Sequence, residues 1–323
     1  MCRIMDDKIY ILDTNAARQL PQILGDNPKV QAAIISKRML EMNMRFYLSP
    51  IVIMELLSHI NQGNPDFAAS YRAIRSLILI GESFPKNMRY VACPADIIIA
   101  NLLWGQSIKS RADMYNDFVG VACNIAHQKI DDVTSIKTTE GDSLEDFQYK
   151  MRCSFVEHLK NVMNAYQKEN VLQKAKNDYT FEQAALYGTL LGMVYELMAK
   201  DNHFININSE LESARKNNQW DRVYCIIEKI KYDCDLIYSN YPSLRALLVI
   251  LVKKIIDSDM QMGNKKIANY LQDLYLSFHI NQAFDCGRSI LVTDDKTILD
   301  ATKQAGVNCG IIKYEDFKST IAK

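Results

Sequence analysis

Strand-like and helix-like segments alternate at both ends of the chain, and this alternation restricts the possible fold more than any other feature. Residues 9–12 are a continuous apolar run, Ile-Tyr-Ile-Leu, which is typical of a strand covered on both faces. Such alternation predicts one parallel sheet with helices on both faces, a three-layer α/β/α fold. The segments that follow the first strand are a helix at 28–42, a strand at 45–49, a helix beginning at Pro50 and, near the other end, a helix at 265–283, a strand at 289–293, a helix ending at Gly306 and a strand at 308–313.

The middle of the chain has a different pattern. Between residues 63 and 263, apolar residues recur almost only at the spacing of amphipathic helices. One stretch, 127–146, is polar and is expected to be a loop. We therefore expect a discontinuous α/β domain, formed by 1–62 and 264–323, that is split by a large all-helical insertion at 63–263.

The charge balance limits what the chain can bind. Its 323 residues include 38 Lys and Arg and 38 Asp and Glu, so the net charge gives no overall basic footprint for a nucleic acid. Nucleic-acid binding would need a local basic patch, and phosphate chemistry would need metal ions to offset the charge. The eight cysteines form no C-x-x-C pair, which argues against a structural zinc site and favours a reducing, cytoplasmic location. The N-terminus has no apolar leader, and the apolar run 244–256 contains two lysines, so we expect no membrane span.

Four carboxylates are predicted to meet at one edge of the sheet. Ligand sites in parallel α/β sheets lie beyond the carboxyl ends of the strands. Asp13 follows the first strand directly, Glu55 lies early in the helix after the second strand, and Asp295 follows the strand at 289–293. Asp273 lies early in the helix that precedes the strand at 289–293. In a right-handed crossover this helix and this strand run in opposite directions over similar lengths, so Asp273 should lie near the carboxyl end of the strand, where Asp295 lies. Like charges held together in this way need a hard divalent cation such as Mg²⁺ or Mn²⁺.

The motifs around these acids resemble those of the PIN-domain nuclease family. In chain order they are YILDTN, the glutamate in SPIVIMELLSHI, the aspartate in NYLQDLYLSFHI, and ILVTDD. The resemblance covers 7–62 and 264–320, and it implies a parallel α/β/α sandwich and a Mg²⁺- or Mn²⁺-dependent endonuclease that usually acts on RNA. The chain departs from the family pattern in a longer spacing between Asp273 and the last motif and in a far larger insertion.

The resemblance also assigns roles to particular residues. The family's acids match Asp13, Glu55, Asp273 and Asp295, the hydroxyl or amide beside the first acid matches Thr14 or Asn15, and the T-x-D motif begins at Thr293. We expect three of the acids to hold the metal and Asp273 to support a second ion or the attacking water. The residues expected to orient the ligands or the phosphate are Thr14, Asn15, Thr293 and Asp294.

Each acid also has a purely structural explanation. Asp13 could simply cap the helix that follows it, and either Asp294 or Asp295 could cap the helix after the last motif. We assign this second cap to Asp294 and the metal to Asp295, because Asp295 has the T-x-D spacing. Glu55 lies among apolar residues, and it needs a function only if it lies on the buried side of its helix. His59 shares the helical face of Glu55, but a lone histidine is more often a surface residue than a catalyst.

Two other functions fit parts of the same pattern. Haloacid-dehalogenase-like phosphatases also place an aspartate at a strand end and carry helical caps, but they need a second acid where this chain has Asn15. A catalytically silent PIN-like protein would instead use the insertion as a scaffold. In the nuclease, the insertion would shape access of RNA, bind a protein partner or form a homo-oligomer interface, and all three uses stay open.

Overall fold

The computed structural model describes residues 7–61, 63–128, 181–202, 204–257 and 264–322, and, between 129 and 180, only residues 146, 149, 150, 153 and 157. The stretch predicted to be a polar loop, 127–146, therefore lies almost entirely outside the described residues.

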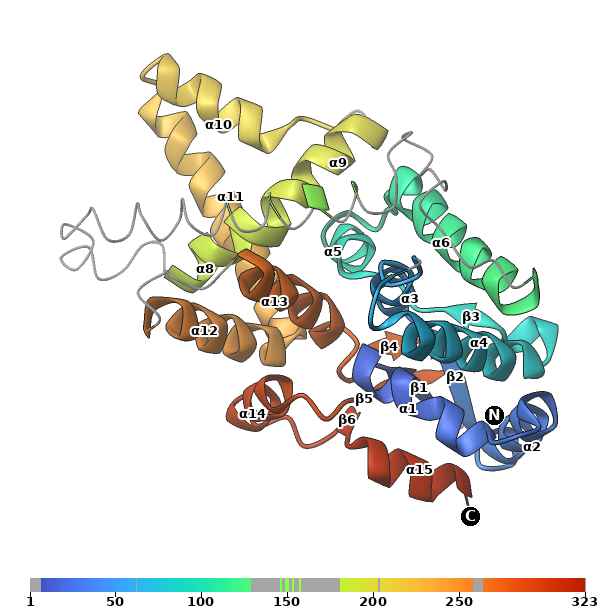
Figure 1. Ribbon diagram of the computed structural model, residues 1–323. Coiled ribbons are helices and arrows are strands. Elements are labelled where there is room, and N and C mark those ends of the chain that lie inside the picture. Colours follow the sequence, from blue (N-terminus) through green and yellow to red (C-terminus); the bar gives the residue numbers. More distant parts are fainter. Residues whose placement is uncertain are drawn as a thin grey trace, which may run out of the picture. The chain divides into compact units, whose positions relative to one another are not determined.

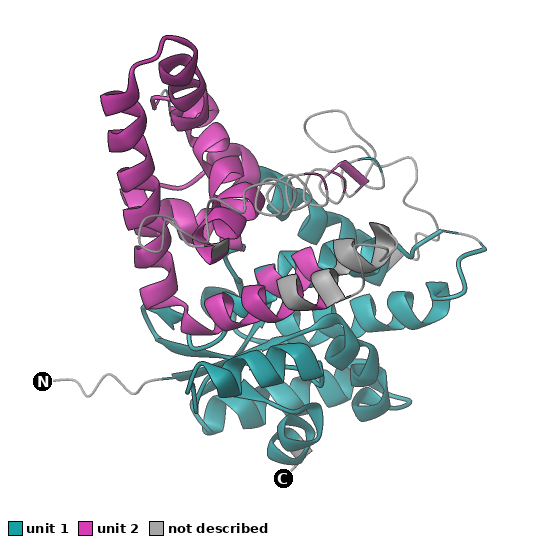
Figure 2. Ribbon diagram, turned by 90° about the vertical axis from the view of Figure 1, so that its left-hand side faces the viewer, with its two compact units in different colours: residues 1–94, 113–148, 275–323 teal, residues 95–112, 149–274 magenta. Residues whose placement is uncertain are grey.

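The chain forms two compact units (Figure 2). The first, here called the sheet unit, consists of 1–94, 113–148 and 275–323, and the second, the helical unit, consists of 95–112 and 149–274. The sequence placed the start of the insertion at residue 63, whereas the sheet unit continues to residue 94 before the first stretch of the helical unit.

The sheet unit is a mixed α/β structure built on a mostly parallel sheet. The strand order is β3-β2-β1-β5-β4, with β6 beside β5. Every pairing is parallel except that of β4 with β5. Within the described residues the strands are β1 Asp7–Leu12, β2 Met44–Leu48, β3 Tyr90–Val91, β4 Ala283–Phe284, β5 Gly287–Val292 and β6 Ile311–Ile312.

The first strand is buried on both of its faces, as the sequence predicted. All four side chains from Ile9 to Leu12 are at most 3 % exposed. Ile9 and Ile11 pack in one cluster with Tyr47 and Ala92, and the Tyr10 ring lies 5.3 Å from that of Phe317. Side chains that alternate between two covered faces explain why this strand is a continuous apolar run.

Helices α1 and α4 lie side by side against the sheet (Figure 1), and α4 also contacts α2, α3 and β2. The helix Phe67–Ser83 therefore belongs to the sheet unit, although the sequence placed it in the insertion, and so does β3, which pairs with β2. The described helices of this unit are α1 Thr14–Leu24, α2 Pro28–Glu41, α3 Pro50–Leu57, α4 Phe67–Ser83, the short 3₁₀ turn η1 Lys86–Met88, α14 Lys296–Gln304 and α15 Tyr314–Ala322.

The helix predicted at 265–283 ends earlier than expected. Helix α13 spans Asn264–Ser277, and Asn281 takes a left-handed backbone conformation with φ of 58°. The chain then enters β4, which pairs with the first residues of β5 as an antiparallel hairpin. The buried Ser289 hydroxyl fixes this turn, because it donates to the carbonyl of His279 at 2.7 Å and accepts from the Gln282 N–H at 2.8 Å.

The helical unit has no strand among its described residues. Helix α6 Lys109–Gln128 starts in this unit and continues in the sheet unit. None of the helices in the described part of the chain is both long and apolar enough to cross a membrane. Helix α13 lies in this unit up to Leu274. The other described helices of the unit are α5 Ala95–Trp104, α8 Phe181–Leu186, the π-helical turn η2 Tyr187–Leu191, α9 Gly192–Asn202, α10 Ile207–Lys216, α11 Trp220–Asn240 and α12 Pro242–Asp257.

Replacing Gly287 with Ala is expected to destabilise the sheet unit by about 3 kcal/mol, the upper end of the usual cost of overpacking. Gly287 pairs with Asp7, and a Cβ atom at 287 would lie 1.9 Å from the Asp7 carbonyl oxygen, so β5 would be forced away from β1. Gly120→Ala is the matched control, because a Cβ atom there meets nothing within 4 Å. Urea denaturation followed by circular dichroism measures both variants, and equal midpoints would contradict the prediction.

Candidate functional site

Asp13 lies at the carboxyl end of β1, where the register of the sheet places it next to Thr293. Strands β1 and β5 pair in parallel from Asp7 with Gly287 to Leu12 with Val292, and the Asp13 N–H continues the ladder by donating to the Val292 carbonyl at 3.0 Å. The Asp13 side chain is only 4 % exposed. Its Oδ1 accepts the N–H of Ala16 at 2.6 Å, so Asp13 caps helix α1.

Thr293 connects the two acids that follow β1 and β5. Its fully buried hydroxyl donates to Oδ2 of Asp13 and accepts the N–H of Asp295 at 3.0 Å. Its backbone N–H donates to the carbonyl of Ile312 at 3.0 Å, which ties this turn to β6. A threonine held in this way fixes the carboxylate of Asp13 in one orientation.

Glu55 reaches the same edge from the helix that follows β2. Helix α3 begins with Pro50 at its first turn, directly after β2 ends, so Glu55 lies within its first two turns. The hydroxyl of Thr14, at the start of α1, donates to Oε2 of Glu55. Glu55 is half-buried and Thr14 is buried. Asn15 is exposed, so Thr14 is the neighbour of Asp13 that contacts an acid.

Asp295 is the residue that caps helix α14, which differs from our assignment of that cap to Asp294. Its Oδ1 accepts the N–H groups of Thr297 at 2.7 Å and Ile298 at 3.0 Å. Asp294 is exposed and accepts the N–H of Tyr314 at 3.3 Å. Because both cap bonds go to Oδ1, capping still leaves Oδ2 of Asp295 to serve as a ligand.

The electrostatics show that these acids influence one another. Burial raises the pKa of Asp13 to about 6, and the negative charges of Glu55 and Asp295 raise it in the same direction. The hydrogen bonds from Thr293 and Ala16 act the other way and lower this pKa. Ionisation of Asp13 therefore costs more in the folded protein than in the unfolded chain, and a positive charge close to it would lower that cost.

The fourth predicted acid, Asp273, lies in helix α13. It is half-buried in α13 and falls in the helical unit, whereas the other three acids fall in the sheet unit. Its grouping with them stays a prediction.

The side chains of the three acids have the type of ligand atom that a hard divalent cation prefers. Asp13, Glu55 and Asp295 offer carboxylate oxygens, the ligands that Mg²⁺ and Mn²⁺ prefer, and two threonine hydroxyls already orient the first two. As they stand, no three Asp, Glu, His or Cys side chains of the described residues are close enough together to surround an ion. Binding would thus need these side chains to draw closer, and the cation would remove the cost of ionising Asp13.

Sequence reasoning missed Arg18 and Asp66, which form an ion pair at 3.9 Å. Arg18 lies four residues after Thr14 on α1, so it lies one helical turn along from a residue of the site. The i, i+4 spacing was therefore the available signal for Arg18. Asp66 gave none, because it lies in a turn whose path the sequence does not specify.

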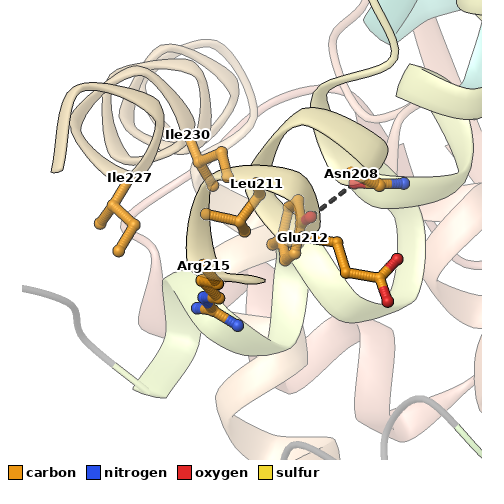
Figure 3. Close-up of a pocket in the computed structure, with 7 residues that line it drawn as sticks. Asn208, Leu211, Glu212, Arg215, Ile227 and Ile230 are labelled. Atoms are coloured by element: carbon orange, nitrogen blue, oxygen red, sulfur yellow. Dashed lines mark hydrogen bonds between the residues drawn. The ribbon is translucent and has the colours of Figure 1, made fainter. Parts of the chain in front are cut away.

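The helical unit carries a cleft of its own (Figure 3). It has a volume of about 400 Å³ and lies between α10, α11 and the π-helical turn η2. Its wall is mostly apolar, with Leu211, Ile227 and Ile230, while Tyr187 donates to Oδ1 of Asn208 at 2.5 Å. The cleft therefore lacks the group of acids found at the sheet edge.

Comparisons of this chain with protein-family models, with curated proteins and with solved structures give no match.

Replacing Asp13 with Asn is expected to stabilise the protein at alkaline pH when divalent metals are absent. The pKa of Asp13 rises from 3.8 to about 6 on folding, so the stability it contributes is complete below pH 3.8 and is lost as the pH rises through 6. The free energy of unfolding of Asp13→Asn should therefore exceed that of the wild type by up to about 3 kcal/mol at pH 8, and this difference should shrink towards pH 4. Urea denaturation in EDTA at both pH values measures this difference. A variant that is less stable than the wild type at pH 8 would contradict the prediction.

Proposed function

We propose that the sheet unit is a metal-dependent nuclease of the PIN-domain type that hydrolyses phosphodiester bonds of RNA. The observation that carries this proposal is the buried, threonine-held Asp13, whose pKa is raised by burial and by the charges of Glu55 and Asp295. A buried carboxylate with a raised pKa is typical of a functional site rather than of a surface cap. The acids also follow β1, β2 and β5 of the parallel sheet, which puts them at the edge where such sheets bind ligands.

Each residue of the site has a role in this proposal. Asp13, Glu55 and Asp295 would hold Mg²⁺ or Mn²⁺, and Asp273 would support a second ion or the water. When bound, the metal would activate a water molecule and stabilise the charge that develops on the phosphoryl group. Thr293 and Thr14 hold Asp13 and Glu55 in place by hydrogen bonds. Asp295 is held in place by two backbone N–H groups at the start of α14.

The rest of the chain has a supporting part in the proposal. The helical unit would shape the access of RNA, bind a protein partner or form a homo-oligomer interface. A cytoplasmic location fits the scattered cysteines, since the described ones are all free thiols.

Cleavage of RNA by the purified full chain tests the proposal. With Mn²⁺ and a mixture of single-stranded and structured RNAs, the wild type should cut, and EDTA should stop it. Asp13→Asn should lower the rate by more than about a hundredfold, since loss of a ligand costs at least as much as loss of a residue that orients one. Asp300→Asn is the matched control, because Asp300 is exposed on α14, and it should leave the rate unchanged.

The same experiment separates the rival functions. Unchanged cleavage by Asp13→Asn, or an equal loss in Asp300→Asn, would contradict the assigned site. Release of phosphate from small phosphomonoesters, with a covalent aspartyl phosphate at Asp13 and no cut RNA, would favour the phosphatase. Absence of both activities from a folded wild type would favour the scaffold.

A further inference from the structure

A cationic side chain lies one helical turn away from the acids of the site. Thr14 and Glu55 are joined by a hydrogen bond, and α1 packs against α3. Arg18 follows Thr14 by four residues in α1, so it lies about 6 Å further along the same face, and His59 lies just beyond the end of α3 at Leu57. Arg18 and His59 share one neighbour, the carboxylate of Asp66.

Asp66 contacts both residues from the turn before α4. Its Oδ2 lies 3.9 Å from Nη2 of Arg18 and 3.9 Å from Nδ1 of His59. Nη2 of Arg18 also donates to the Ser70 hydroxyl, on the first turn of α4, at 3.3 Å. The guanidinium is therefore held at the border between α1, α4 and the site.

The hydrogen-bonding capacity of Arg18 is largely unused. Its contacts with Ser70 and Asp66 both involve Nη2, and the contact with Asp66 is too long for a hydrogen bond. Asp66 is 51 % exposed, so solvent weakens this ion pair. Nε of Arg18 is buried and has no hydrogen-bond partner among the described residues. An arginine presents a planar fork of donors that matches two oxygens of a phosphate.

We propose that Arg18 binds a phosphate of the RNA strand next to the phosphate that is cleaved. This inference rests on the proposed nuclease function and adds to it a substrate-binding residue. A chain with no net charge needs a local cation to hold a polyanion beside its own carboxylates, and Arg18 supplies that charge one turn from Thr14. Asp66 and Ser70 keep the guanidinium in place until the phosphate takes over its free donors.

The test measures the affinity for RNA and its dependence on salt, for a normal and for a modified RNA. The probe is a short single-stranded RNA containing a linkage that the wild type cuts, bound in Ca²⁺ and measured by fluorescence anisotropy. Arg18→Gln should weaken binding about tenfold, and the slope of log affinity against log salt should fall by about 0.7, the value for one phosphate contact on a single strand. Making the phosphate next to the cut neutral, as a methylphosphonate, should weaken wild-type binding similarly and should remove most of the difference between the variant and the wild type.

Two further variants separate binding from a structural role. Arg288→Gln removes the same charge from an exposed residue at the start of β5, the opposite edge of the sheet, and should leave affinity and slope unchanged. Arg18→Lys keeps the charge but not the fork, so it should keep the slope and lose part of the affinity. If Arg18 only ties α1 to α4, the slope will not change in any variant.

The outcomes distinguish this inference from the function on which it rests. A wild type that cuts RNA, combined with an Arg18→Gln variant of unchanged affinity and slope, would overturn the role of Arg18 and leave the nuclease intact. The role of Arg18 would also be overturned if Arg18→Gln weakened binding of the normal RNA and of the methylphosphonate RNA by the same factor. A folded wild type that cuts no RNA would overturn both.

Discussion

The pairing of β1 with β5 is the constraint on which the site depends. These two strands are the centre of the sheet, and their parallel register brings Asp13 and Thr293 to adjacent positions at its carboxyl edge. The hydrogen bond from Thr293 to Asp13 then joins the ends of the two strands. Gly287 permits the close approach at the other end of the pair. A shift of one residue in this register would turn the Thr293 hydroxyl away from Asp13 and would separate the acids.

Capping and metal binding are not competing explanations for Asp13 and Asp295. Each accepts backbone N–H groups at the start of a helix, Asp13 for α1 and Asp295 for α14. The positive end of a helix dipole favours a negative charge, so both helices support the acids that cap them. The same residues therefore fix the course of the chain and concentrate negative charge at one edge of the sheet. The raised pKa of Asp13 shows that this support does not fully offset burial.

Local patterns predicted most of the sheet unit and part of the site. The apolar run at Ile9–Leu12 identified the central strand because both of its faces are buried, and the acid after each strand followed from the rule for parallel sheets. The sequence did not reveal the β4–β5 hairpin, because it depends on the Ser289 hydroxyl and on the left-handed Asn281. Nor did it show that α4 belongs to the sheet unit, since helical periodicity is the same in either unit. The choice between Asp294 and Asp295 as a cap depended on backbone geometry that spacing alone does not contain.

The great separation of Asp13 from Thr293 along the chain has a consequence for the timing of folding. These partners are 280 residues apart, and the whole helical unit is made between them. During translation the first strand leaves the ribosome long before β5 exists, so the central pair of the sheet cannot close on the growing chain. Asp13 and Asp295 can therefore come together only after residue 295 has been made. A nascent chain that ends before this residue holds the first acid and its helix but not the second acid.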